Sequence, residues 1–115
     1  MYLKNIKEVY QTTVNAPGAV NAVKQVLIGP DQGWDGWVMR LFTLSSAGCS
    51  PRHSHPWPHI NFVVKGRGIL YFDGEEFDLE PGSSAFVPAD AIHQFTVRGD
   101  QDLVFICIVP EQGDV

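Results

Sequence analysis

The chain of 115 residues lacks any long apolar run. No stretch approaches the roughly 18 consecutive apolar residues of a membrane-spanning helix, so a helical membrane protein is not expected. Residues 1–8 contain no apolar core of a signal peptide, and we therefore expect a cytoplasmic protein. Lys and Arg number only 8 against 13 Asp and Glu, which gives a net charge of −5. Without a basic patch, we expect neither a nucleic-acid nor a membrane partner.

Cysteine is also scarce, with only Cys49 and Cys107 present. No cysteine pair has the spacing of a zinc finger, and no nucleophile and base stand in a hydrolase motif. A cytosolic chain of this size does not need a disulfide. Cys107 lies in the apolar run 103–109, so it is either a small buried hydrophobic residue or a thiol that faces an internal cavity.

Long helical periodicity is missing as well. Short apolar runs rich in Val, Ile, Phe and Tyr are separated by Gly, Pro and Asp, which predicts strands joined by turns. Asp73-Gly74 accepts the positive φ angles of a two-residue hairpin turn. The predicted strands cover residues 24–29, 37–45, 59–65, 69–72, 75–79, 83–88, 93–97 and 103–109.

This pattern of strands predicts an all-β sandwich or barrel. Residues 37–42 are apolar on both faces, which indicates cover from a second sheet or from a subunit interface. Hydrophobic residues make up 44% of the chain, enough for one modest core. With no linker and no internal repeat, we expect a single domain over residues 1–115, in which residues 1–23 form an edge strand and a loop.

Histidine is rare but concentrated. His53, His55 and His59 lie within seven residues, and the fourth histidine, His93, begins a separate predicted strand. Alternate side chains of an extended segment point to the same side, so His53 and His55 can reach one point. Neutral imidazole is a good ligand for divalent transition metals. The sequence therefore predicts one metal ion on four histidines; the alternative is a Pro-rich polar loop that binds nothing.

The surroundings of three of these histidines resemble the first of two motifs that mark the cupin family. The similar positions are Gly48, His53, His55, His59 and Gly66. A glutamate is usual in cupins where this chain has His59. The chain thus resembles a subset of small single-domain bacterial cupins with an all-histidine, manganese-binding site. This resemblance implies Mn or Fe, ahead of Ni, Cu, Co or Zn, as the bound ion.

A second motif strengthens the resemblance. Gly82, Pro88 and His93 are similar to the second cupin motif, and both motifs together span residues 48–97. Two motifs in the correct order are far more specific than either alone. Membership of the cupin family implies a double-stranded β-helix, the jelly-roll barrel, as the fold.

The predicted donor set also indicates a chemistry. Four neutral imidazoles leave the full charge on a divalent ion, which favours an anionic or electron-rich ligand. In octahedral coordination two positions stay open for a bidentate substrate, or for substrate and dioxygen. We therefore expect a metal-dependent, dioxygenase-like oxidoreductase acting on a small organic molecule. The alternatives are a Lewis-acid isomerase or lyase, and a non-catalytic small-ligand-binding or sensor module.

The sequence offers only two candidates for polar contact with a substrate, and no general base is evident. Asn61 is a candidate for hydrogen bonds to substrate, and Arg40 for clamping a carboxylate. The alternatives are that Asn61 is an ordinary polar residue at a cavity mouth and that Arg40 belongs to a surface or interface ion pair. The expected pocket lining consists of Phe42, Asn61, Phe95, Phe105 and Cys107, although the aromatic residues also suit a simple core. We expect a homodimer, formed through strand exchange or sheet packing.

Overall fold

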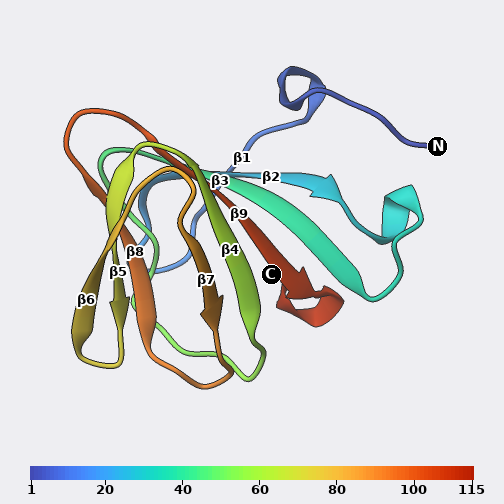
Figure 1. The fold of residues 1–115 in the computed structure, drawn as a ribbon. Helices are drawn as coiled ribbons and strands as arrows, with labels where there is room; N and C mark the ends of the chain where they lie inside the picture. Colours follow the sequence, from blue (N-terminus) through green and yellow to red (C-terminus); the bar gives the residue numbers. More distant parts are fainter.

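The computed structural model describes residues 1–115 and contains one curled sheet of nine strands (Figure 1). The strands are β1 (Thr12–Thr13), β2 (Val20–Ile28), β3 (Trp37–Cys49), β4 (His59–Lys65), β5 (Arg67–Phe72), β6 (Glu75–Leu79), β7 (Ser84–Val87), β8 (His93–Arg98) and β9 (Leu103–Pro110). Three short 3-10 helices complete the chain: η1 (Ile6–Glu8), η2 (Pro30–Gln32) and η3 (Glu111–Gly113). No helix is both long enough and apolar enough to cross a membrane.

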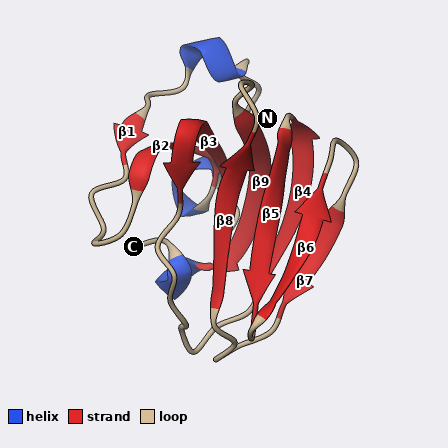
Figure 2. Cartoon of the chain, turned by 90° about the vertical axis from the view of Figure 1, so that its left-hand side faces the viewer, coloured by secondary structure: helices blue, strands red, loops and turns tan.

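The sheet connects strands that are distant in sequence. Its order is β6-β5-β8-β3-β9-β4-β7, and β2 joins β3 while β1 joins β2. All of these pairings are antiparallel. Figure 2 shows β1 and β2 at the edge, beside β3, and the remaining strands curling around the interior. The predicted all-β jelly-roll barrel is therefore confirmed.

Strand β3 joins the two halves of this barrel. It pairs with β9 from Trp37 to Leu44 and then with β8 at Cys49. The change of partner requires a bend, and Ala47 adopts a positive φ of 62° just before Gly48. A Cβ atom on Gly48 would lie 2.6 Å from the Ser45 carbonyl oxygen, so only glycine fits this bend.

The core lies between the inward faces of the strands. Along β9 buried residues alternate with half-buried ones, and Leu103, Phe105, Cys107 and Val109 point inward. They pack in one apolar cluster with residues of β3, β4, β7 and β8. Burial of each large side chain contributes about 1.5–3 kcal/mol. The same inward faces carry the cavity residues described below.

Two turns show why particular residues stand where they do. Asp73 and Gly74 have φ angles of 45° and 93° and join β5 to β6, which confirms the predicted hairpin. Gly66 separates β4 from β5 with a φ of 85°, and a Cβ there would lie 2.0 Å from the Asp102 carbonyl oxygen. The second glycine of the first cupin-like motif is thus required by a close approach of backbone.

Two strands extend four residues beyond the ranges that the sequence predicts. β2 begins at Val20 and β3 continues to Cys49, and these two residues pair with each other. The added ends, residues 20–23 and 46–49, carry mainly small side chains, and only one residue in each is buried, so hydrophobic alternation does not mark them. Hydrogen bonding between β2 and β3 extends both strands, and the local amino-acid composition does not predict this pairing.

Candidate metal centre

All four histidines gather at one place in the barrel. His59 begins β4 and His93 begins β8, whereas His53 and His55 lie in the loop between β3 and β4. The loop is tied to the barrel by two backbone hydrogen bonds between His53 and His93, of 3.2 and 2.9 Å. Two strand starts and one anchored loop therefore position the imidazoles.

The distances within this histidine cluster suit a metal ion. The ligand atoms of His53, His55 and His93 all lie within 4.8 Å of one another, so these three residues could hold an ion. His59 adjoins them, because its Nε2 lies 3.1 Å from Nε2 of His93. Its ring centroid is 5.2 Å from that of His55.

Backbone carbonyl groups fix the tautomers of two of the rings. Nδ1 of His55 lies 2.8 Å from the Trp57 carbonyl oxygen, and Nδ1 of His93 lies 2.9 Å from the Ala91 carbonyl oxygen. A carbonyl oxygen only accepts, so both Nδ1 atoms must donate a proton. In the neutral rings, Nε2 is then left with its lone pair free for coordination.

Asn61 fixes the tautomer of His59. Its side-chain oxygen lies 2.5 Å from Nδ1 of His59, and its amide nitrogen donates to the Ile106 carbonyl oxygen at 3.4 Å. The second contact orients the amide, so the oxygen must face His59 and accept from Nδ1. The lone pairs of His59 Nε2 and His93 Nε2 consequently face each other, and they repel unless a cation lies between them.

Three of the four histidines are held in the neutral form that a metal requires. Burial, followed by the charge that His93 would carry, lowers the pKa of His59 to about 3. Burial also lowers the pKa of His93 to about 4, against the hydrogen bond to Ala91. Burial, followed by the influence of His55, lowers the pKa of His53. At neutral pH these rings do not have to release a proton before they bind an ion.

A cavity of about 690 Å³ opens beside the cluster, and all four histidines line it. The aromatic rings of Phe42, Phe95 and Phe105 form its apolar wall. Phe105 stacks on Phe95 with centroids 4.4 Å apart and on Phe42 with centroids 5.5 Å apart. Cys107 also lines the cavity, and burial raises the pKa of its thiol.

Of the two candidate substrate-contact residues, Arg40 lies on the cavity wall and Asn61 does not. Asn61 is 2% exposed and lies behind His59 rather than on the cavity wall, because its oxygen and its amide are both engaged there. Arg40 lies on the cavity wall and is 8% exposed, not in a surface ion pair. Its Nη2 donates to Sγ of Cys107 at 3.0 Å.

The sequence alone did not indicate three further residues around the cavity. Trp57 stacks on His55 with centroids 4.7 Å apart and an interplanar angle of 8°. The only local feature that indicates a place for Trp57 at the site is its position two residues after His55. Lys24 of β2 and Asp114 meet beside Arg40, and no local pattern connects them, because 90 residues separate them in the chain.

Comparisons with known proteins agree with this geometry. The chain is 39% identical over 61 residues to acireductone dioxygenases of Bacillus thuringiensis and Bacillus cereus, a match that covers 49% of this chain and 36% of each relative. The matched segment thus spans about a third of the length of these curated relatives.

Solved structures match over nearly the whole chain. The polyketide cyclase RemF from Streptomyces resistomycificus is 28% identical, with a TM-score of 0.90, covering 96% of this chain and 79% of that one. A predicted oxalate decarboxylase from Thermotoga maritima shares the fold, with a TM-score of 0.85 at 16% identity over 95% of this chain and 98% of that one. Residues 40–109, more than half of the chain, match the family described as "Cupin domain", and the chain belongs to the cupin family.

Proposed function

We propose that this cupin is a metal-dependent enzyme that acts on a small, largely apolar organic molecule, with a dioxygenase-like reaction as the first candidate. One observation carries the proposal: the Nε2 atoms of His59 and His93 face each other at 3.1 Å beside an apolar cavity of about 690 Å³. Cavities of this size suit small-molecule ligands.

In this proposal His53, His55, His59 and His93 hold one divalent transition metal ion, with Mn or Fe ahead of Ni, Cu, Co and Zn. The residues fit such an ion, since the donors are neutral and converge. When bound, the ion would supply a Lewis acid with its full positive charge and, if redox-active, a site for dioxygen chemistry.

The chain's own residues have distinct roles in the proposed reaction. The carbonyl groups of Ala91 and Trp57 and the side chain of Asn61 hold three imidazoles in one orientation each. Orientation of this kind preorganises a metal site. The aromatic wall of Phe42, Phe95 and Phe105 binds the apolar part of the substrate and excludes water from the histidine cluster.

Two comparisons support different reactions. The segment shared with the acireductone dioxygenases supports a reaction with dioxygen. The likeness to the polyketide cyclase RemF extends over 96% of this chain and supports a second candidate, Lewis-acid catalysis on a carbonyl compound without dioxygen. No Asp or Glu side chain lines the cavity, so in either reaction its charged groups are the ion together with Lys24 and Arg40.

One experiment separates these candidates. The protein is loaded in turn with Mn, Fe(II) and Zn and incubated with benzoylacetone or catechol, two apolar compounds that offer paired oxygen ligands. Oxygen uptake that requires Mn or Fe supports the dioxygenase. Conversion in the absence of oxygen, with Zn as effective as Fe, supports the Lewis-acid enzyme. Ligand-induced thermal stabilisation without conversion would instead support the non-catalytic binding module.

We also propose that the protein forms a homodimer through its outer sheet face. Ile60, Phe62 and Val64 of β4 and Phe86 of β7 all point outward and are exposed, and Ile60 pairs with Phe86 in the sheet. A contiguous exposed apolar sheet face is typical of a subunit interface. Packing of this face against its copy would cover it.

A further inference from the structure

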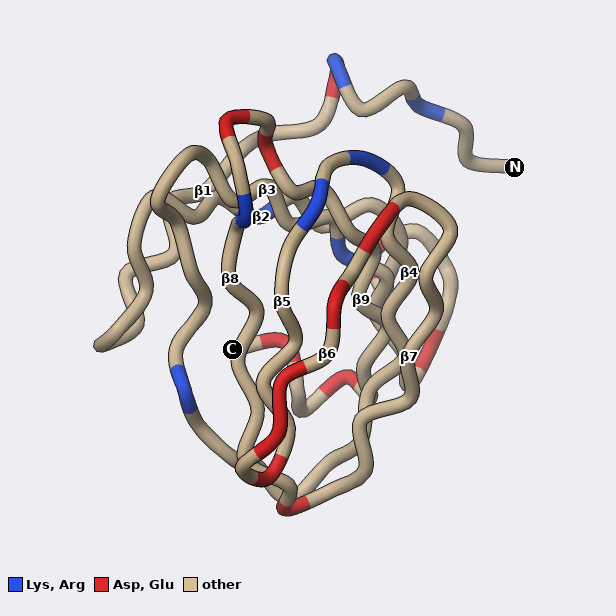
Figure 3. The backbone as a smooth tube through the Cα atoms, turned by 60° about the vertical axis from the view of Figure 1, so that its left-hand side comes forward, with Lys and Arg blue, Asp and Glu red and all other residues tan.

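The charges inside the cavity differ in sign from the charge of the molecule. The chain carries a net charge of −5, yet the charged side chains that line the cavity are Lys24 and Arg40 alone. No Asp or Glu side chain lines the cavity, and strand β6, with Glu75, Glu76 and Asp78, carries several acidic residues on the outside (Figure 3). The cavity therefore attracts anions although the protein as a whole repels them.

Arg40 is buried with its donors only partly used. Its Nη2 donates to Cys107 at 3.0 Å, and its guanidinium carbon lies 4.9 Å from the ring centroid of Phe42. Its Nε, however, is buried and has no hydrogen-bond partner. A buried, unsatisfied donor on a cation is destabilising, because its hydrogen bond to water is lost and no hydrogen bond within the protein replaces it.

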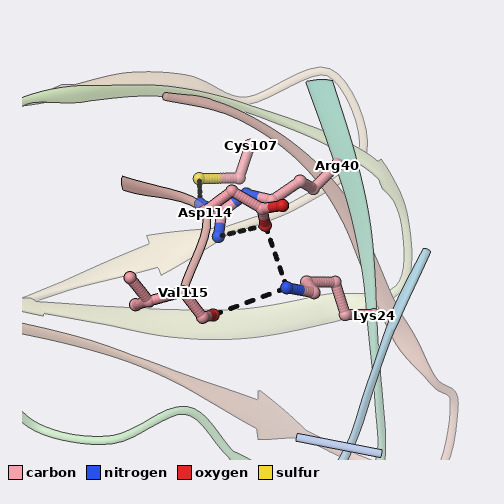
Figure 4. A network of polar contacts seen from close by, with 5 residues as sticks. All are labelled: Lys24, Arg40, Cys107, Asp114 and Val115. Carbon is pink, nitrogen blue, oxygen red and sulfur yellow. Dashed lines mark hydrogen bonds and ion pairs between the residues drawn. The ribbon is translucent and has the colours of Figure 1, made fainter. Parts of the chain in front are cut away.

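A single carboxylate serves both cations. Oδ1 of Asp114 lies 2.9 Å from Nζ of Lys24 and 3.7 Å from Nη1 of Arg40 (Figure 4). Asp114 is the only acidic side chain within 4.0 Å of either cation. The Arg40 contact is too long for a hydrogen bond, and it leaves the Nε donor unused. Arg40 and Lys24 can therefore accommodate a better-placed carboxylate.

Asp114 is brought to this position by residues 111–115. Gly113 and Val115 line the cavity, and Lys24 also donates to the carbonyl oxygen of Val115 at 3.4 Å. Gly113 packs on Trp57 so closely that a Cβ there would lie 2.7 Å from its Nε1. The segment thus borders the cavity at both the cationic pair and the aromatic ring that stacks on His55.

We propose that Lys24 and Arg40 form a carboxylate-binding subsite of the cavity, which Asp114 occupies until a ligand displaces it. The ligand class is an organic anion with a carboxylate at one end and a flat apolar body. The carboxylate binds the cationic pair in place of that of Asp114, and the body packs along Phe42 and Phe105. This inference deepens the proposed function, on which it rests, by naming the substrate class.

The test uses two probes of equal shape, 2-naphthoate and the uncharged 2-naphthamide, with calorimetry on the full chain before and after chelation of metal. We expect 2-naphthoate to bind about tenfold more tightly than 2-naphthamide. Lys24→Gln should abolish most of this preference, because Lys24 is half of the pair. Asp114→Asn should tighten 2-naphthoate binding several-fold, because the competing carboxylate is gone.

A matched control lies outside the cavity. Arg98 and Asp78 form an exposed ion pair at 2.8 Å, and Arg98→Gln should leave the affinity for both probes unchanged. Circular dichroism and thermal unfolding show whether each variant is folded.

Two results would overturn the subsite. The first is equal affinity for 2-naphthoate and 2-naphthamide. The second is a preference for 2-naphthoate that survives Lys24→Gln but disappears on chelation, because the carboxylate would then bind the metal. An unchanged affinity in Asp114→Asn would overturn the displacement by Asp114. These measurements detect binding and need no turnover. The carboxylate subsite can therefore be confirmed in a protein that shows no catalysis, or refuted in one that does.

Discussion

The Nε2 atoms of His59 and His93 lie 3.1 Å apart, and both rings carry their proton on the opposite nitrogen. Asn61 enforces this for His59 and the Ala91 carbonyl group enforces it for His93. Two lone pairs at this distance repel each other, so the arrangement gains most from a shared cation.

Removal of one ring should greatly weaken metal binding. We expect His59→Ala to lower the affinity for Mn and Fe by at least about 100-fold, because one donor and the cation-stabilised contact with His93 are lost. Ile60→Ala is the matched control, since Ile60 is the next residue and points outward at 52% exposed. Metal content by elemental analysis after dialysis measures both, and equal occupancy in the two variants would refute the assignment of four histidines.

Asn61 should act through His59. We predict that Asn61→Leu lowers metal affinity about 10–100-fold, because His59 loses the acceptor that selects its tautomer. The control is Gln25→Leu, which removes a buried amide that donates to Ile6 and Val9, away from the histidines. Both variants should lose stability, but only Asn61→Leu should change the metal affinity. If both affinities match the wild type, Asn61 has no positioning role.

The metal-free protein should lose stability in mild acid. Histidine titrates near 6.5 when unperturbed, whereas His59 titrates at about 3 and His93 at about 4 in the fold. Because the folded pKa values are depressed, the unfolded chain takes up protons first as pH falls. The stabilisation is therefore complete above pH 6.5 and is lost between pH 6.5 and about 3.

Urea unfolding of chelated protein at pH 7, 5.5 and 4.5 measures this loss. The variant His59→Gln should show a smaller drop over this range, because one of the depressed groups is gone. Identical pH profiles for the variant and the wild type would contradict a buried neutral His59. Comparison of the two chains removes the contribution of the carboxylates, which is common to both.

Gly66 should be far less replaceable than Gly74. Both have positive φ angles, of 85° and 93°, but a Cβ on Gly66 would overlap the Asp102 carbonyl oxygen while nothing lies within 4 Å of Gly74. We expect Gly74→Ala to cost about 1 kcal/mol from backbone strain. Gly66→Ala should cost about 3 kcal/mol or more, because the turn between β4 and β5 must also move. Denaturant unfolding measures the difference, and equal costs would show that the backbone relaxes freely at Gly66.

The outer face of β4 should control assembly. We predict that Phe62→Glu shifts the protein from dimer to monomer in sedimentation equilibrium, because a charge cannot be buried in the apolar interface. Phe77→Glu on β6 is the control, since Phe77 has a similar exposure but lies on the edge strand at the opposite end of the strand order from β4 and β7. A wild-type monomer at high micromolar concentration would rule out this interface.

Several features of this protein were predictable from the sequence because they depend on local chemistry. The hairpin at Asp73-Gly74 follows from positive φ angles that few other residue pairs accept. The spacing of His53, His55 and His59 already places three donors within one short segment. The glycines and histidines of both motifs indicated the cupin fold before any contact was known. Phe105 and Cys107, two residues apart in a predicted strand, were expected to line the pocket together, and both line the cavity.

Other features were decided only by the tertiary structure, because they join residues that are far apart in the chain. No local pattern indicates that Asn61 serves His59 rather than the substrate, since this depends on the Ile106 carbonyl group of a different strand. Arg40 could have faced outward, and its burial beside Cys107 follows from the pairing of β3 with β9. Lys24 and Asp114 meet across 90 residues. The sequence determined which donors exist and how they repeat, whereas packing determined which of them converge, because convergence requires long-range contacts that local propensity does not encode.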